Sequence, residues 1–326
     1  MLRYDLRVPE HSGPPEARYS TCLEQCQWAD QRGFAGVRFH EHHHSDDGYL
    51  PSSVIMASAV AGRTRGLALR LSVIVLPLYD PIRLAEDLAV LDLASGGRVE
   101  LVVAAGYVAA EFEMFGRDIA DRLQLLEEGV DALRSAWTGE EFTFRDRRVK
   151  VRPRPHGGRQ IPVMMGGSSA RAARQAARIA DGFEPVPREF LAAYLTECER
   201  LGRRPGWYPG PGHGLLLMHL AEDPDATWER IRPYAWYENS SYLPWTRPAG
   251  TKVGYREVSD PDQLRTGGPY RVVTPEECLR LVRDLGPDAE IHLHPLMGGM
   301  DPELSWESLQ LFESKVMPAL RAEGLL

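Results

Sequence analysis

The sequence is poor in the features that mark secreted, membrane-spanning and nucleic-acid-binding proteins. Its 326 residues include only four cysteines and no Cys-x-x-Cys pair, so neither a disulfide framework nor a cysteine-based zinc cluster is expected. The longest apolar run, around residues 71–78, is far shorter than the roughly 20 residues that span a bilayer. The net charge is −8, and the basic residues do not gather into a stripe. This distribution argues against nucleic acid or an anionic membrane as a partner.

Signals for targeting or for several domains are also missing. The segment Met1–Val8 is too charged for the apolar region of a signal peptide. We see no internal repeat, no low-complexity tract and no sharp change of composition. We therefore expect one domain, residues 1–326, in the reducing environment of the cytoplasm.

The sequence does contain a regular alternation of strand-like and helix-like segments. Expected strands cover residues 2–8, 34–40, 67–76, 99–104, 161–165, 182–184, 214–220 and 291–294. Expected helices cover residues 16–31, 51–62, 82–93, 121–137, 169–180, 189–201, 225–236 and 304–320. Such a series of strand-then-helix units predicts an α/β fold, the parallel (β/α)8 or TIM barrel.

Two stretches interrupt this alternation. Residues 142–155 have the pattern of a short hairpin. Residues 240–275 are polar and rich in Gly, Pro and Tyr, with little periodicity. A structureless stretch of that length is typical of an active-site lid or of a disordered insertion.

A cluster of histidines, FHEHHHSDDG at residues 39–48, follows the second expected strand. Active sites of barrels lie at the carboxyl ends of their strands, so the cluster is expected there. If the strand continued through it, His40, His42 and His44 would lie on one side. Because an imidazole titrates near neutral pH, one of them is a natural general acid or base.

Two other hypotheses for these histidines stay open. The last expected strand adds His292 and His294, and imidazoles from both strands could hold zinc in a metal-dependent hydrolase. No further Asp, Lys or His stands out at the ends of the intervening strands, which weakens that hypothesis, and we assign no metal ligands. The histidines could also simply fill a polar loop.

A second candidate site follows the fifth expected strand. There Gly166 and Gly167 precede Ser168 and Ser169, which open an Ala- and Arg-rich helix. Glycines let a ligand approach the backbone, and the amino end of a helix attracts anions. The same pattern is also compatible with a plain serine cap on the helix.

Arg122 is a third candidate, in the first turn of a strongly amphipathic expected helix. A cation is unfavourable at that end of the helix dipole, so a phosphate ligand would account for it. Pairing with Asp118 or Asp121 is the alternative.

Taken together, these pieces resemble the bacterial luciferase-like flavin-dependent monooxygenases. The resemblance covers nearly the whole chain except about residues 185–265. It rests on the motifs GFAGVRFHEHHH, VIVLPLYDPIRLAEDLAVLDLASGGRVELVVAAG, EFEMFG, PVMMGGSS, VVTPEECLRLV and SLQLFESKVMPAL, in this order.

The resemblance implies a TIM-barrel enzyme that uses reduced FMN and O2 to oxygenate a small, hydrophobic or aromatic molecule. By position, His42 matches the catalytic imidazole of the family. Residues matching the flavin site are Ser72, Val73, Arg122, Gly166, Gly167, Ser168 and Ser169. The bond between Ser72 and Val73 matches a place where the family often has a cis peptide beneath the flavin ring. Zinc hydrolysis becomes the less favoured alternative.

The resemblance also implies partners. Glu86 lies on a helix similar to the dimer-interface helix of the family, so a homodimer is expected. Residues 240–275 match a mobile loop that shields the site. Where luciferase has Cys-Arg-Gly, this chain has Ala104-Ala105-Gly106. Without that arginine we expect weak FMN binding, with reduced FMN arriving as a diffusing co-substrate from a separate flavin reductase.

The same departure keeps the deazaflavin F420 open as the alternative cofactor, as in F420-dependent oxidoreductases on this barrel. A non-catalytic flavin-binding protein is a further alternative. For the substrate pocket we expect His40, His44, Tyr107, Trp236 and Tyr237. Other aromatic or apolar candidates for its wall are Phe112, Met114, Tyr242 and Trp245.

Overall fold

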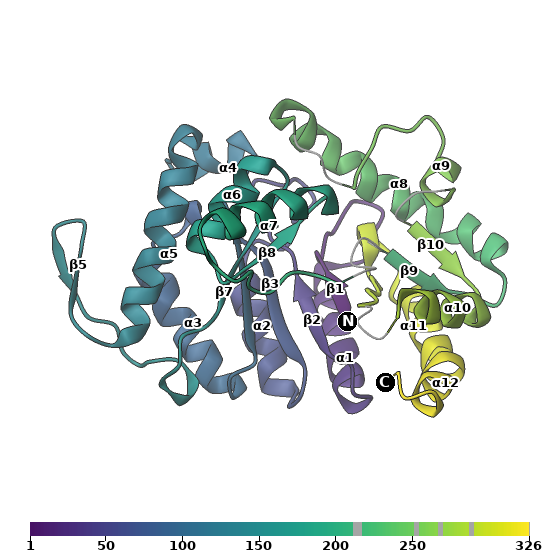
Figure 1. Cartoon of the computed structure of the whole chain (residues 1–326). Helices are drawn as coiled ribbons and strands as arrows, with labels where there is room; N and C mark the ends of the chain where they lie inside the picture. The colour runs from purple at the N-terminus through teal and green to yellow at the C-terminus, as the bar shows by residue number, and fades with distance from the viewer. Residues whose placement is uncertain (211–216, 251–253, 267–269, 287–289, 326) are drawn as a thin grey trace.

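The computed structural model describes residues 1–210, 217–250, 254–266, 270–286 and 290–325 (Figure 1). Its centre is a six-stranded parallel sheet in the order β1-β2-β3-β4-β7-β8. These strands are β1 (Leu2–Tyr4), β2 (Gly36–Phe39), β3 (Ala68–Val75), β4 (Val99–Ala104), β7 (Val163–Gly167) and β8 (Gly182–Pro185). The α/β prediction is thereby confirmed.

A second parallel pair of strands, β9 (Leu217–Leu220) and β10 (Tyr270–Val273), continues the sheet beyond β1. Leu293 makes parallel bridges both to Leu2 of β1 and to Met218 of β9, and so connects the two sheets. The parallel series therefore runs from β8 through β1 to β10, as in a fold of the TIM-barrel type. Among the described residues no backbone pairing joins β8 to β10.

Helices surround this sheet, as Figure 1 shows. They are α1 (Pro15–Gln31), α2 (Ser53–Arg63), α3 (Pro81–Ser95), α4 (Ala109–Met114), α5 (Arg122–Thr138), α6 (Ala170–Ile179), α7 (Leu191–Arg200), α8 (Pro224–Ala249), α9 (Asp262–Arg265), α10 (Pro275–Leu285), α11 (Pro302–Leu311) and α12 (Met317–Ala322). The short antiparallel hairpin of β5 (Phe142–Phe144) and β6 (Arg147–Val149) projects from one end of the molecule. This confirms the hairpin expected at 142–155.

Local signals account for several of these boundaries. Helix α3 begins after Asp80, whose side chain accepts the N–H groups of Ile82 and Arg83, and it ends at Gly96 in the left-handed conformation. Such an aspartate cap and such a glycine are the usual helix-limiting residues. Helix α5 buries the apolar stripe that its sequence predicts, including Leu126, Val130, Leu133 and Trp137.

The prediction of a loop at residues 240–275 is wrong for most of the residues of this stretch that the structure describes. Its first ten residues belong to α8, which continues to Ala249 although it contains Pro233, Pro244 and Pro248. Proline normally ends a helix, but buried side chains such as Ala235 and Tyr242 hold this one against the rest of the molecule. Residues 270–273 form strand β10. Residues 251–253 and 267–269 of the expected loop lie outside the described residues.

Two expected strands are shorter than predicted. The first ends at Tyr4, so Asp5 and Arg7 leave the sheet. The last, at 291–294, is reduced to the bridges of Leu293. Residues 214–216 of the seventh expected strand lie outside the described residues.

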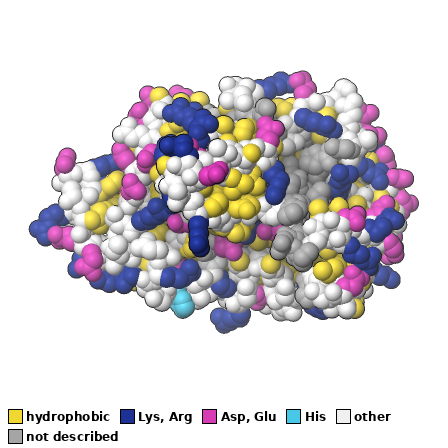
Figure 2. Space-filling model, viewed as in Figure 1, with side chains coloured by type: hydrophobic (Ala, Val, Ile, Leu, Met, Phe, Trp, Pro, Cys, Tyr) yellow, Lys and Arg dark blue, Asp and Glu magenta, His cyan; other side chains and the backbone are white. Residues whose placement is uncertain are grey.

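All four cysteines are buried and unpaired, as expected. In the described part of the chain, no helix combines the length and the apolar character needed to cross a membrane. On the face that Figure 2 shows, basic and acidic side chains are interspersed, and hydrophobic side chains gather near its centre.

Candidate active site

The segment that follows β2 brings His42 next to a carboxylate from α4. His42 is 8% exposed, and its Nδ1 atom lies 2.7 Å from Oε1 of the fully buried Glu111. The same oxygen accepts the backbone N–H of His43 at 2.8 Å. A carboxylate in this position selects the imidazole tautomer with hydrogen on Nδ1 and leaves Nε2 available.

Aromatic rings enclose the imidazole of His42 on several sides. The ring of Trp245 is stacked on it at 4.5 Å between centroids and an interplanar angle of 28°. The rings of Tyr49, Tyr107 and Tyr242 meet it edge-on at 5.0, 5.7 and 5.8 Å. This apolar surrounding keeps water away from a group able to transfer a proton.

The hydroxyl of Tyr107 contacts the second ring nitrogen of His42. It lies 3.4 Å from Nε2. Burial, and after it the charges of Tyr242 and Glu111, raise the pKa of Tyr107. The hydroxyl therefore stays protonated and can donate a hydrogen bond.

Beside these rings lies a buried ion pair between Arg7 and Asp47. The Nε atom of Arg7 is 2.7 Å from Oδ2 of Asp47, and both side chains are almost fully buried. The Arg7 guanidinium packs over Tyr49, Tyr242 and Trp245, and Tyr237 donates to Asp47 at 2.9 Å. Burial opposes the charge on Arg7, but Tyr242, Asp5 and Asp47 raise its pKa overall. The ion pair anchors α8 against the segment that carries His42.

The neighbouring histidines do not share one side with His42, because β2 ends at Phe39. His40 lies close to Arg3 and Arg38, and burial and then these two cations lower its pKa far below the usual range. His44 is exposed and has left-handed backbone (φ 51°). A zinc cage of His40, His42 and His44 is therefore excluded by their placement.

His43 and Glu41 belong to a separate contact. His43 is buried against Phe115, with Nε2 3.5 Å from Oε1 of Glu41. Glu41 also accepts hydrogen bonds from the hydroxyls of Ser53 and Tyr79, both at 2.7 Å. Glu41 thus links the histidine segment to α2 and to the loop after β3.

The candidate flavin residues lie at the ends of β3 and β7 and at the starts of two helices. The peptide bond between Ser72 and Val73 is cis. A Cβ atom on Gly166 would approach Val73 to 2.9 Å, so β3 and β7 meet closely here. Ser169 caps α6 by accepting the N–H of Ala172 at 3.1 Å.

Arg122 is the first residue of α5, which is in contact with α6. A hydrogen bond of 3.1 Å from Gln175 of α6 to the carbonyl of Leu123 joins the two helices. Arg122 donates to the carbonyl of Ile119 at 2.8 Å, which leaves further guanidinium hydrogens. A cation, the amino end of a ten-residue helix and the serine hydroxyls are a donor set that fits a phosphate.

Two expected pocket residues lie further from His42. Trp236 packs against a separate apolar cluster that includes Trp228, Ile231 and Tyr270. Tyr237 reaches the site through its hydrogen bond to Asp47 and through its ring, over which the Arg7 guanidinium lies. Of the residues expected in the pocket or its wall, Tyr107, Tyr242 and Trp245 contact His42.

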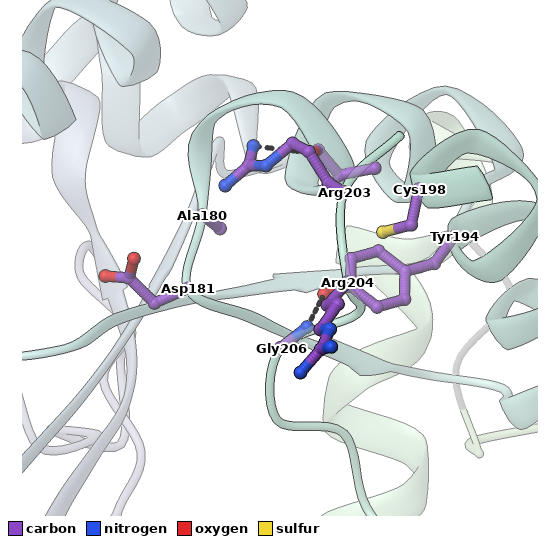
Figure 3. Close-up of a pocket in the computed structure, with 8 residues that line it drawn as sticks. Ala180, Asp181, Tyr194, Cys198, Arg203, Arg204 and Gly206 are labelled. Atoms are coloured by element: carbon purple, nitrogen blue, oxygen red, sulfur yellow. Dashed lines mark hydrogen bonds between the residues drawn. The ribbon is translucent and has the colours of Figure 1, made fainter. Parts of the chain in front are cut away.

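Two cavities of the described structure lie away from these residues. One, of about 180 Å3, lies between α6 and α7 and is lined among others by Asp181, Tyr194 and Arg203 (Figure 3). There Arg203 already donates to main-chain carbonyls at the end of α6, and Tyr194 accepts the N–H of Gly206. The other, of about 500 Å3, lies beside His219 and Glu307. Neither contains His42.

Sequence reasoning missed three residues of this arrangement, Glu111, Tyr49 and Arg7. Glu111 stands in the motif EFEMFG, which we used only as part of the resemblance. Tyr49 and Arg7 carry no signal in the sequence, since each lies in an irregular segment.

Comparison with known proteins supplies a family context. The profile of the family described as "Luciferase-like monooxygenase" matches residues 4–270. The chain is 32% identical over 149 residues to the 4-hydroxyprotoasukamycin monooxygenase of Streptomyces nodosus subsp. asukaensis, covering 43% of this chain and 40% of that protein. It is 30% identical over 124 residues to the oxygenase component of the flavin-dependent trigonelline monooxygenase of Acinetobacter baylyi, covering 37% and 34%.

An F420-dependent relative is similar as well. The F420-dependent glucose-6-phosphate dehydrogenase of Nakamurella multipartita is 31% identical over 195 residues, covering 54% of this chain and 57% of that protein. The chain thus spans less than two thirds of the length of each of these three relatives.

Solved structures share the fold. The monooxygenase RslO1 of Streptomyces bottropensis superposes with a TM-score of 0.78 at 22% identity, over 98% of both chains. The oxygenating constituent of 3,6-diketocamphane monooxygenase of Pseudomonas putida, solved in complex with FMN, gives 0.70 at 15% identity over 97% of both chains.

Proposed function

The chain belongs to the luciferase-like monooxygenase family, and from this we propose that it uses reduced FMN and O2 to oxygenate a small hydrophobic or aromatic molecule. The observation that carries the proposal is the His42–Glu111 pair, closed in by aromatic rings. It places one proton-transferring group among aromatic rings at the carboxyl end of the strands, where barrel enzymes have their active sites.

In this proposal the chain supplies proton transfer and exclusion of water. Nε2 of His42 holds or delivers the proton, because Nδ1 is held by Glu111. Tyr107 orients the imidazole or the substrate from the other side. When bound, reduced FMN supplies the electrons that activate O2.

Arg122, Ser168, Ser169 and the backbone at Gly166 and Gly167 would hold the FMN phosphate, with the bond between Ser72 and Val73 beneath the flavin ring. The expected arginine after β4 is replaced by Ala104-Ala105, which removes one cation from the flavin site. FMN is therefore proposed to bind weakly and to exchange with a separate flavin reductase. The relative named as an oxygenase component supports such a two-component system.

An F420-dependent oxidoreductase is the second candidate, and the similarity to an F420-dependent dehydrogenase supports it. The two cofactors can be separated by binding and by oxygen use. An F420 enzyme would bind the deazaflavin and would consume no O2 with reduced FMN.

The pocket wall is proposed to consist of Tyr107, Tyr242 and Trp245, in direct contact with His42. His40, His44, Trp236 and Tyr237 stay candidates for substrate contacts, for which α8 or the segment after β2 would have to move. Such a motion matches the role expected for residues 240–275, a mobile cover that shields the site from water.

We also propose that the protein is a homodimer of single-domain subunits. Helices α2 and α3 expose the apolar side chains Ile55, Val90 and Leu93, which are 71, 54 and 41% exposed. Exposed apolar groups on neighbouring helices are typical of an interaction surface. The unpaired cysteines fit a reducing cytoplasm.

The proposal is tested by anaerobic titration with reduced FMN, followed by oxygen-consumption assays with a panel of aromatic and terpenoid compounds. Wild-type protein should bind reduced FMN and consume O2 in a substrate-dependent manner. His42→Gln should bind reduced FMN but lose about 10²–10⁴-fold of the coupled turnover, whereas His156→Gln, a change at an exposed histidine outside the site, should resemble wild type. Failure of the wild-type protein to bind reduced FMN would overturn the proposal.

A further inference from the structure

Three buried ligating side chains lie together beneath the aromatic residues of the active site. They are Asp5, just after β1, His294, just after the bridge at Leu293, and Glu238 on α8. Their exposed fractions are 0, 2 and 1%. One ligating atom from each can be chosen so that all three atoms lie within 4.8 Å of one another.

Two of these side chains are left without hydrogen bonds in the described structure. Both carboxylate oxygens of Asp5 and both ring nitrogens of His294 are buried and have no hydrogen-bond partner. An unpaired buried polar atom costs about 1–3 kcal/mol, and more if it is charged. The geometry therefore points to a missing partner within the cluster.

From this arrangement we infer that Asp5, Glu238 and His294 bind one divalent transition-metal ion, with zinc as the first candidate. Nε2 of His294 lies 3.5 Å from Oδ1 of Asp5. Two atoms that ligate one tetrahedral zinc at about 2.1 Å are themselves about 3.4 Å apart. Two carboxylates and one imidazole are a suitable donor set, and three protein ligands leave a position for water.

The second nitrogen of His294 fits the same arrangement. Nδ1 lies 3.7 Å from Oε1 of Glu238. Glu238 in turn accepts hydrogen bonds from Tyr255 and Tyr270, at 3.0 and 3.3 Å, so its position is set independently of an ion.

Nearby positively charged side chains lower the affinity of this site for a cation. Arg3 lies 3.6 Å from Glu238, and Arg7 packs close to Asp5 but is paired with Asp47. With neutral His294, the charges of Asp5, Glu238 and Arg3 sum to −1, which still attracts a cation. We therefore expect an exchangeable ion that a chelator removes.

Such an ion would tie α8 to the ends of β1 and of the last barrel segment. Tyr242 and Trp245, which cover His42, lie on α8 four and seven residues after Glu238. The inferred ion is thus structural and independent of flavin chemistry. It is distinct from the excluded zinc cage of residues 40, 42 and 44.

The test is a metal titration of the full-length protein without flavin. After removal of metals with EDTA, the protein is incubated separately with Zn²⁺, Mn²⁺ and Co²⁺. Bound metal is then measured by mass spectrometry after gel filtration, and thermal stability is measured in parallel. We expect about one equivalent of Zn²⁺ and a higher Tm that EDTA reverses.

Substitutions locate the ion. Asp5→Asn and His294→Gln should each weaken Zn²⁺ binding by more than the 10–100-fold typical of losing an outer partner. His219→Gln, a change at an equally buried histidine outside the cluster, should bind as wild type. Binding of less than about one tenth of an equivalent of every metal by wild type would overturn the inference, as would undiminished binding by a folded Asp5→Asn, His294→Gln double variant. The wild-type measurement decides the matter even if the variants fail to fold.

Discussion

The Nδ1 atom of His42 lies 2.7 Å from Oε1 of Glu111, a residue 69 positions further along the chain. The carboxylate also accepts the backbone N–H of His43. Glu111 therefore controls both the tautomer of the imidazole and the path of the segment that carries it.

Glu111→Gln should lower kcat about 10²-fold, because the amide no longer stabilises a protonated imidazole. The KM for reduced FMN should change little. The pH profile of kcat should shift as well, which a purely structural defect would not produce. Glu113→Gln, at an exposed carboxylate on the same helix, is the control. Wild-type kcat and pH profile in Glu111→Gln would contradict the assigned role.

Arg122→Gln should weaken the binding of reduced FMN about 10–100-fold, since a hydrogen bond to a charged group contributes about 1.5–3 kcal/mol. Fluorescence titration under anaerobic conditions measures the dissociation constant. Arg83→Gln, which removes an exposed arginine on α3, should leave it unchanged. Equal affinities in the two variants would exclude Arg122 from the phosphate site.

Asp47→Asn should destabilise the protein by about 3–5 kcal/mol, because it removes the carboxylate that is paired directly with the buried Arg7. Urea denaturation gives the free energy of unfolding. The comparison is Glu141→Gln, whose partner Arg148 is 80% exposed and for which a loss of at most about 1 kcal/mol is expected. Similar losses in both variants would show that the Arg7–Asp47 pair contributes no more than a surface ion pair.

Stability should fall as the pH is lowered from about 6.5 to about 4, partly because of His219. Burial, opposed by Glu307 and aided by Arg230, lowers the pKa of His219 from 6.5 to about 4. In that pH window the unfolded chain binds a proton that the folded chain excludes. The free energy of unfolding therefore falls by up to about 3 kcal/mol. His219→Leu should flatten this part of the profile of unfolding free energy against pH, whereas His44→Gln should retain it. An unchanged slope in His219→Leu would show that other groups cause the acid sensitivity.

Val90→Lys together with Ile55→Lys should convert a dimer into a monomer, because two charges would be placed in the proposed apolar interface. Light scattering coupled to gel filtration reports the mass. Met114→Lys, which changes an apolar residue 59% exposed on α4, serves as the control. A wild-type monomer, or a double variant that stays dimeric, would refute the interface on α2 and α3.

The strand-and-helix alternation, the hairpin and the helix limits were predictable because the signals for them are local. Apolar periodicity, Asp80 before Pro81 and Gly96 after Ser95 act within a few residues of the chain. The family motifs are local too, and they indicated His42. The C-terminal region was harder, since α8 keeps its helical path through Pro244 and Pro248 only with support from distant contacts.

The partners of His42 depend on the folded chain. Glu111, Tyr49 and Trp245 come from α4, from the segment after β2 and from α8, and no local pattern relates them. The same holds for the cluster of Asp5, Glu238 and His294, in which Asp5 is separated from the other two residues by most of the sequence. Local preferences thus assign residues to strands, helices and a family, whereas the meeting of buried charges and rings follows from how those elements pack in three dimensions.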